Sequence, residues 1–106
     1  MNIETLRDYC ISKQGATESF PFGDDTLVFK ANGKIFALVN LEGELHLNLK
    51  CDPLLAIELR ERYSSVTPGY HMNKKHWNTV LLDGSVPDNN VLEWIDHSYN
   101  LITGKH

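Results

Sequence analysis

The sequence has few of the features that tie a chain to a membrane or to an oxidising compartment. It holds two cysteines in 106 residues, Cys10 and Cys51, which lie far apart and form no Cys-x-x-Cys pair. Disulfide scaffolds are dense in cysteine, so we expect two reduced thiols. No apolar run approaches the roughly 18 residues that span a bilayer, and the opening segment MNIETLRDYC carries acids that do not fit a signal or transit peptide. These absences predict a cytoplasmic protein with no membrane partner.

The sequence also lacks an excess of positive charge. Its 10 Lys and Arg are outnumbered by 14 Asp and Glu, which gives a formal net charge of −4. A chain of this sign has no overall attraction to nucleic acid or to anionic lipid. Any binding of polyanions therefore has to come from a local patch.

Catalytic and metal-binding motifs are missing as well. There is no Walker loop, no GxSxG and no GxGxxG. Zinc ligands usually come in closely spaced pairs, whereas His71 and His76 are five positions apart in a segment that looks like a loop. We therefore expect no enzymatic activity, no cofactor and no metal ion.

The residues that are present fit one globular domain over residues 1–106. Apolar residues make up 42% of the chain and charged residues 23%, which is close to average for such domains. Helical spacing of apolar side chains predicts a first helix that begins after Asn2 and ends before Gly15. Residues 17–25 are rich in turn formers, and residues 21–23 break any regular element.

Three strands are predicted in the first half of the chain. Two β-rich runs flank Asn32-Gly33, a pair that tolerates positive φ at both centres of a type I′ turn, so residues 26–40 predict a β-hairpin. Its second arm is apolar on both faces, which is typical of a central strand. Residues 44–50 alternate strictly between leucine and other side chains, which predicts a third strand with one partly solvated face.

The second half predicts two helices and a further strand. Asp52 can accept from the free backbone N–H groups of a helix, and Pro53 fits the first helical position. Residues 66–70 suit a short strand or a turn, residues 77–82 suit a strand, and Asp88 suits the N-cap of a final helix. The order α-β-β-β-α-β-α, with antiparallel hairpins, predicts an α+β fold in which a β-meander packs against helices.

One segment concentrates cationic and aromatic groups. PGYHMNKKHWNTVLLDG, residues 68–84, holds two lysines, two histidines, a tyrosine, a tryptophan and two asparagines between turn-forming ends. Lysines can contact phosphate, asparagines can donate and accept hydrogen bonds, and aromatic rings can stack on bases. The segment and the end of the preceding strand together predict a basic-aromatic binding surface. Its candidate residues are Lys50, Tyr70, His71, Asn73, Lys74, Lys75, His76, Trp77 and Asn78.

The same residues allow a structural interpretation. Trp77 alternates with Thr79 and Leu81, so its ring can simply close the core, and the two adjacent lysines can form a solvated hairpin tip. Cys51 precedes a predicted helix N-terminus, where a thiol pKa can be lowered. A small buried apolar group at a strand–helix junction explains that cysteine equally well.

Longer motifs resemble a known family. PFGDDTLVFK, GKIFALVNLEG, LNLKCDP, PGYHMNKKHWNTVLLDG and SYNLI extend along nearly the whole chain, and by them the sequence is identified as a member of the MmcQ/YjbR family of small bacterial proteins. The resemblance implies a compact α+β fold similar to the CyaY-like class, described as a double wing, and the description of predicted DNA-binding protein. It implies no catalytic residue. The family signature maps here onto residues 68–78 and onto Lys50, Cys51, Asp52 and Pro53.

We therefore expect a bacterial cytoplasmic protein that binds DNA and catalyses no reaction. In this hypothesis the lysines contact phosphate, Tyr70, His76 and Trp77 stack or shape the wing, and the asparagines supply polar contacts. An alternative hypothesis is a protein- or small-ligand-binding module that uses the same face, which fits the acidic net charge better. A third hypothesis is an enzyme that uses Cys51 or His71.

Overall fold

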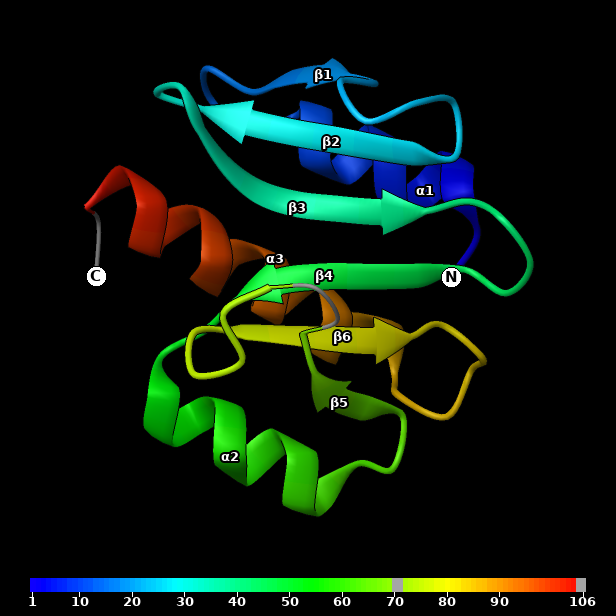
Figure 1. The fold of residues 1–106 in the computed structure, drawn as a ribbon, viewed down its shortest axis with the longest axis vertical. Coiled ribbons are helices and arrows are strands. Elements are labelled where there is room, and N and C mark those ends of the chain that lie inside the picture. Colours follow the sequence, from blue (N-terminus) through cyan, green and yellow to red (C-terminus); the bar gives the residue numbers. More distant parts are fainter. Residues whose placement is uncertain (70–71, 105–106) are drawn as a thin grey trace.

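The computed structural model describes residues 1–69 and 72–104. Its elements are α1 (Ile3–Ile11), β1 (Thr17–Ser19), β2 (Thr26–Ala31), β3 (Lys34–Asn40), β4 (His46–Lys50), α2 (Pro53–Arg62), β5 (Val66–Pro68), β6 (Trp77–Leu81) and α3 (Asp88–Thr103). The strands form one six-stranded sheet in the order β1-β2-β3-β4-β6-β5, and all neighbours are antiparallel. Helices α1 and α3 lie behind the sheet in Figure 1, and α2 lies beyond its β5 edge. The predicted α+β class and element order are confirmed.

Two short edge strands, β1 and β5, have little signal in the sequence pattern. β1 falls within the segment expected to be rich in turns and pairs with β2. Its three residues, TES, are too few and too polar to show alternation. Residues 66–70 were expected to form a short strand or a turn, and β5 shows that they begin with a strand, which ends at Pro68. Proline is tolerated there because the outer side of an edge strand needs no ladder hydrogen bond.

The β2–β3 hairpin forms as predicted. Asn32 has φ 54° and Gly33 has φ 74°, the positive values that a type I′ turn requires at both central residues. β3 then lies between β2 and β4, and residues 36–39 are all buried. The prediction of a central strand from its two apolar faces is confirmed.

Side-chain caps begin α1 and α2 where the sequence predicts them. Asn2 Oδ1 accepts from the backbone N of Thr5 at 2.8 Å. Asp52 Oδ2 accepts from the backbone N of Leu54 at 3.1 Å and of Leu55 at 3.2 Å. These contacts satisfy amides that have no partner within the helix.

The predicted N-cap of α3 is wrong by one residue. The helix begins at Asp88, Pro87 occupies the cap position with φ −56°, and no side chain caps it. The fixed φ of proline suits a helix start, and its carbonyl accepts from the backbone N of Asn90 at 3.0 Å and of Val91 at 3.3 Å. Asp88 instead pairs with the N-terminal amine of Met1 at 3.4 Å.

The hydrophobic core lies between the sheet and helices α1 and α3. The rings of Phe36 on β3 and Tyr99 on α3 meet edge to face, with centroids 5.4 Å apart. Ser98 is fully buried beside them. Its hydroxyl donates to the carbonyl of Phe36 at 2.6 Å and accepts from the backbone N of Lys50 at 3.0 Å. One side chain of α3 thus binds the backbones of both central strands.

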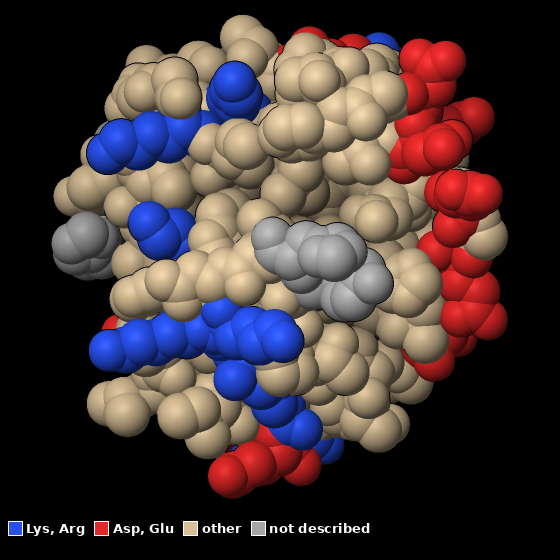
Figure 2. All heavy atoms as spheres, viewed as in Figure 1, with Lys and Arg blue, Asp and Glu red and all other residues tan. Residues whose placement is uncertain are grey.

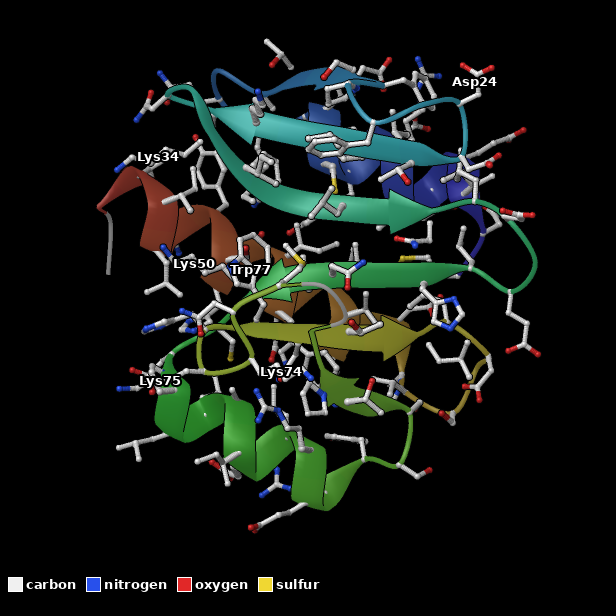
Figure 3. All side chains as sticks on the ribbon, viewed as in Figure 1. Asp24, Lys34, Lys50, Lys74, Lys75 and Trp77 are labelled. Atoms are coloured by element: carbon white, nitrogen blue, oxygen red, sulfur yellow. The ribbon has the colours of Figure 1, made fainter. Side chains whose placement is uncertain are left out.

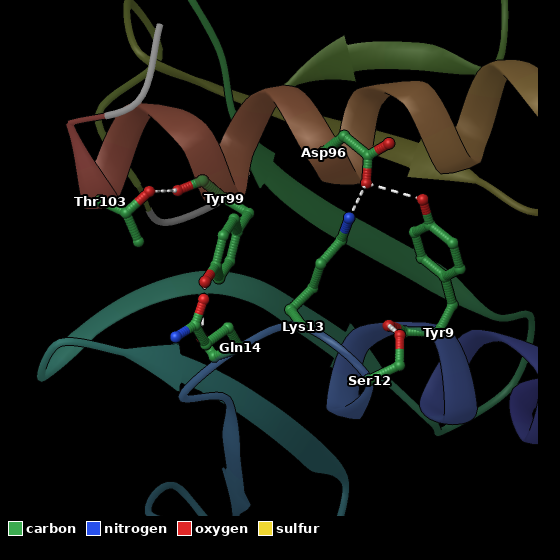
Figure 4. A network of polar contacts seen from close by, with 7 residues as sticks. All are labelled: Tyr9, Ser12, Lys13, Gln14, Asp96, Tyr99 and Thr103. Atoms are coloured by element: carbon green, nitrogen blue, oxygen red, sulfur yellow. Dashed lines mark hydrogen bonds and ion pairs between the residues drawn. The ribbon is translucent and has the colours of Figure 1, made fainter.

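A polar network joins α1 to α3 (Figure 4). The hydroxyl of Tyr9 donates to Asp96 at 2.7 Å, and Lys13 forms an ion pair with the same carboxylate. The Lys13 ammonium also lies 4.8 Å from the centroid of the Tyr9 ring. Nearby, the hydroxyl of Tyr99 donates to the carbonyl of Gln14 at 2.5 Å. The network anchors the end of α1 to the middle of α3.

Tyr9→Phe should lower stability at neutral pH and reduce the further loss at alkaline pH. Burial, and then the hydrogen bond to Asp96, raise the pKa of Tyr9 above its ordinary 10.0. Burial lowers the pKa of Lys13, but contact with Asp96 outweighs it and raises that pKa above 10.5. Protons held more tightly in the folded state stabilise it at lower pH, and this stability is lost above about pH 10. We expect Tyr9→Phe to lose about 1 kcal/mol at neutral pH, measured by urea denaturation.

Tyr63→Phe is the matched control for this experiment. Its hydroxyl also forms a hydrogen bond, accepting from Asn90 Nδ2 at 2.9 Å, but it lies outside the α1–α3 network. This variant should keep the full alkaline loss of the parent. If Tyr9→Phe keeps it too, Tyr9 does not contribute to the pH dependence.

Candidate functional site

The sheet has one face covered by helices and one face, which we call the open face, that no helix of the described residues covers. Helices α1 and α3 pack on the covered face, and Figures 1 to 3 look onto the other. Figure 2 shows basic side chains gathered at one end of the open face and acidic side chains along the opposite rim. Figure 3 places Asp24 at the acidic rim. The basic end, which we call the lysine end, consists of Lys34, Lys50 and Lys75 near the rim and Lys74 farther toward the middle of the view.

Antiparallel pairing explains why these lysines meet. Lys34 is the first residue of β3 and Lys50 the last of β4, and the start of a strand lies beside the end of its antiparallel neighbour. Lys50 pairs directly with Trp77, the first residue of β6, and Lys74 and Lys75 come just before that strand. Residues from three separate segments therefore reach the same end of the sheet.

The same pairing collects the acids at the other end. Three connections carry these acids. The segment before β2 holds Asp24 and Asp25, and the connection from β3 to β4 holds Glu42 and Glu44. The segment after β6 holds Asp83. These strand ends all lie opposite the lysine end because neighbouring strands run in opposite directions. Positive and negative side chains are thus separated because they lie near strand ends at opposite ends of the sheet.

Trp77 and Lys50 are half-buried neighbours on the open face. They stand directly opposite each other in the β4–β6 ladder, so their side chains project on the same side. The chain passes very close to the tryptophan: the backbone N of Gly69 donates to the Trp77 carbonyl at 2.9 Å. A Cβ on Gly69 would come within 2.8 Å of the Trp77 Cβ, so only glycine fits there without displacement.

A tight turn presents Lys74 and Lys75, both of which are exposed. Asn73 Oδ1 accepts from the backbone N of Lys75 at 3.0 Å, and the Asn73 carbonyl accepts from the backbone N of His76 at 3.1 Å. The His76 carbonyl accepts from the backbone N of Cys51 at 2.7 Å, which ties the turn to the end of β4. Asn73 therefore shapes the turn that carries the two lysines.

The side chain of Arg60, on α2, forms hydrogen bonds that hold the same turn in place. Its Nε donates to Asn78 Oδ1 at 2.7 Å. Its Nη2 donates to the carbonyl of Lys74 and, at 3.4 Å, to that of Trp77. Asn78 Nδ2 in turn donates to the carbonyl of Ala56 at 3.4 Å. The rigid fork of donors on a guanidinium suits this multiple contact.

The structure brings together only part of the predicted surface. The three predicted lysines and Trp77 lie together on the open face. His76, which lies between Lys75 and Trp77 in the chain, is half-buried. Asn78 does not belong to this surface: it is 3% exposed and its amide faces Arg60 behind the sheet. The expectation that it contacts a ligand is therefore corrected. Tyr70 and His71 lie outside the described residues.

Two cations that the sequence analysis left out have roles here. Lys34 belongs to the lysine end, and the predicted meander contained the signal, because the start of its second strand must lie beside the end of the third. Arg60 positions the turn through contacts with residues 14 to 18 positions away. Contacts between residues so far apart in the chain cannot be predicted from a local sequence pattern.

The cysteines lack the properties of activated nucleophiles. Burial, with a smaller contribution from Asp52 and opposition from Arg60, raises the pKa of Cys51 to about 11. Burial, slightly opposed by Lys13, raises the pKa of Cys10 to about 12. The cavity beside Cys51 measures about 10 Å³, the lower limit for a single water. These thiols are held neutral and enclosed.

The described part of the chain has neither a metal-ion cluster nor a membrane-spanning helix. Within it, no group of three or more His, Cys, Asp or Glu lies close enough to hold a metal ion. No helix in the same part has the length and apolar character needed to cross a bilayer.

A groove of about 460 Å³ lies over β2, β3 and β4 on the open face. In its floor, Asn48 donates to Asn40 Oδ1 at 3.1 Å and accepts from the hydroxyl of Thr79 at 2.5 Å. Leu38 is 8% exposed, whereas Phe22 is 68% exposed and forms an outer wall. This cavity, which we call the open-face groove, is lined by Phe22, Thr26, Ile35, Leu38, Asn40, Asn48 and Met72.

These features define a class: a small α+β protein whose single antiparallel sheet carries helices on one face and leaves the other open, with a lysine end and a groove. A family model described as YjbR matches residues 11–101. The chain belongs to the YjbR family, as its motifs predict.

Relatives support this assignment. The protein YjbR of Escherichia coli K12 is 40% identical over 100 residues, which cover 93% of this chain and 85% of the relative. The protein YyaQ of Bacillus subtilis is 38% identical over 55 residues, which cover 52% and 46%. A crystal structure of a Deinococcus radiodurans protein with the domain DUF419 matches with a TM-score of 0.93 and 43% identity, covering 98% of this chain and 80% of that one. A crystal structure from Pseudomonas syringae matches with a TM-score of 0.84 and 31% identity, covering 95% and 98%.

Arg60→Ala should destabilise the protein and loosen the lysine turn. The change removes the donor that satisfies the buried Asn78 amide oxygen and two turn carbonyls. Loss of a partner for a buried polar group costs about 1–3 kcal/mol. We expect a drop of that size in urea denaturation and faster amide hydrogen exchange at residues 73–76.

Arg62→Ala provides the control on the same helix. Arg62 is exposed, and within the part of the chain that the structure describes it pairs only with Glu58, at 3.0 Å, one helical turn away. Such surface pairs contribute about 0–1 kcal/mol, so stability and exchange in the turn should stay near those of the parent. Equal effects of the two substitutions would show that Arg60 does not hold the turn.

Proposed function

We propose that the chain is a non-enzymatic DNA-binding protein that contacts phosphates with the lysine end of its open face. The observation that carries the proposal is the gathering of Lys34, Lys50, Lys74 and Lys75 at one end of a face, in a chain with a net charge of −4. Phosphate oxygens are the groups that such ammonium donors contact in protein–DNA complexes.

The lack of ion-pair partners for the four lysines among the described residues supports this role. Among the described residues, none of the four takes part in an ion pair, whereas Arg7, Lys13 and Arg62 each bind a carboxylate. Unpaired ammonium groups of one sign repel one another when they gather. An anionic partner would remove that repulsion, and the acidic rim would keep the same partner away from the rest of the face.

Trp77 adds a ring to the same surface. It stands beside Lys50 in the β4–β6 ladder and is partly exposed. Cations next to aromatic rings are the combination that DNA-binding surfaces use to contact the backbone and stack on bases. The arrangement supports phosphate contact and stacking, both of which tolerate any base sequence.

The number of lysines sets the expected strength. Four phosphate contacts predict a slope of about −3.5 for the logarithm of the binding constant against the logarithm of the salt concentration. Non-specific affinities lie at about 10⁻⁴–10⁻⁶ M near physiological salt, and an acidic chain should lie at the weak end of that range. Binding is therefore best measured at low salt.

Lys74→Ala/Lys75→Ala should weaken DNA binding and reduce its salt dependence. Both side chains are exposed at the tip of the turn, so the fold should not change. Removal of two phosphate contacts should lower the salt slope by about 2 and the affinity at low salt by about tenfold or more. Fluorescence anisotropy with a labelled duplex at several salt concentrations measures both quantities.

Arg7→Ala/Arg62→Ala is the matched control, because it makes the same change in net charge. Both arginines are exposed, and they pair with Glu18 and Glu58 outside the lysine end. The control should retain the salt slope of the parent, since the slope counts cations that neutralise phosphates and these two arginines already pair with carboxylates. Absence of binding by the parent, or an equal loss in both double variants, would contradict the proposed function.

A further inference from the structure

We infer that the open-face groove holds one unpaired base, so that the preferred ligand of the lysine end is single-stranded nucleic acid. This inference rests on the proposed function and names the form of the ligand. It depends on three properties of the groove: its size, the aromatic ring and apolar side chains of its walls, and the lysines at its border.

The groove has the dimensions of a site for one small planar group. Its volume of about 460 Å³ falls within the roughly 300–1,000 Å³ of small-ligand sites. The exposed ring of Phe22 forms one wall, and Met72 also lines the groove. Every base has a π-face that stacks on an aromatic ring whatever its sequence, and thioether sulfur makes favourable contacts with aromatic rings. These walls fit a base better than they fit a phosphate.

Lysines border the groove on the side of the lysine end. Lys30 pairs with Ile35 across the β2–β3 ladder, and Ile35 lines the groove. Lys50 lies two residues beyond Asn48 on β4, on the same face and about 7 Å along the strand. A nucleotide with its base in the groove therefore has ammonium groups within reach of its phosphates.

One polar group in the groove can meet the edge of a base. Asn40 Oδ1 already accepts from Asn48, and no partner for Asn40 Nδ2 is seen among residues 1–69 and 72–104. Because Asn40 is exposed at the end of β3, this amide can donate to a base acceptor. A single donor gives little discrimination among bases, so we expect broad tolerance of sequence.

Base pairing decides which nucleic acid can use the groove. In a duplex the bases are stacked and paired, and a base can enter a pocket only after both contacts are broken. A single strand presents its bases without that cost. A duplex is thus left with the lysine contacts alone, whereas a single strand can use the lysines and the groove together.

Phe22→Ala tests the groove directly. Phe22 is 68% exposed, so its loss should leave the fold intact. With a labelled single-stranded oligonucleotide and a duplex of equal length at low salt, we expect the parent to bind the single strand more tightly. The substitution should weaken single-strand binding by about tenfold, as loss of one stacking contact does, and should leave duplex binding unchanged.

Phe20→Ala is the matched control from the same loop. Phe20 is 49% exposed and lines a separate hollow with Ile3 and Arg7, outside the groove. It should leave binding of both oligonucleotides unchanged. A single-strand loss of equal size in the two phenylalanine variants would overturn the inference, because the effect would then belong to the loop and not to the groove.

The outcomes separate this inference from the proposed function. If the lysine variant loses affinity but Phe22→Ala binds single strand as the parent does, the groove inference is overturned and the lysine end remains a DNA-binding surface. If the parent binds neither oligonucleotide, both proposals are overturned. If a nucleoside monophosphate binds as tightly as the oligonucleotide, the groove is a small-molecule site and the inference is overturned.

Discussion

Antiparallel pairing of β4 with β3 on one side and β6 on the other places the charged groups of this protein. Each pairing sets the end of one strand beside the start of the next. The lysines lie at or just before strand ends on one side of the sheet, and carboxylates line the opposite rim (Figure 2). A one-residue slip in the β4–β6 ladder would turn Lys50 and Trp77 to opposite faces. The lysine end therefore depends on the register of the central strands more than on any single contact within it.

Register in turn depends on the covered face. Leucine and phenylalanine side chains of the strands are buried against α1 and α3, and a shifted strand would expose them. Ser98 adds a direct constraint, since its hydroxyl binds the backbone of β3 and of β4 at once. No helix of the described chain covers the other face, which is why a groove persists there. Stability and the candidate site thus occupy opposite faces of one sheet.

The cations of the chain divide into two kinds. Arg7, Lys13 and Arg62 bind carboxylates, and Arg60 binds carbonyls and the Asn78 amide, so these four act within the fold. The lysines of the open face have no such partner among the described residues and stand where an anionic ligand could reach them. In an acidic protein this division matters more than net charge, because only unpaired cations that share a surface can attract a polyanion.

Local structure could be predicted from the sequence, because caps, turns and strand alternation depend on residues a few positions apart. The helix caps at Asn2 and Asp52 and the Asn32-Gly33 turn all form as predicted. The family and the α+β order were readable for the same reason. Contacts between distant segments were not. They made β1 a strand by pairing it with β2, turned Asn78 away from the open face toward Arg60, and added Lys34 to the lysine end. Sequence alone determined which groups this protein can offer a ligand, and tertiary pairing decided which of them share a surface, because burial and register are properties of neighbours in space.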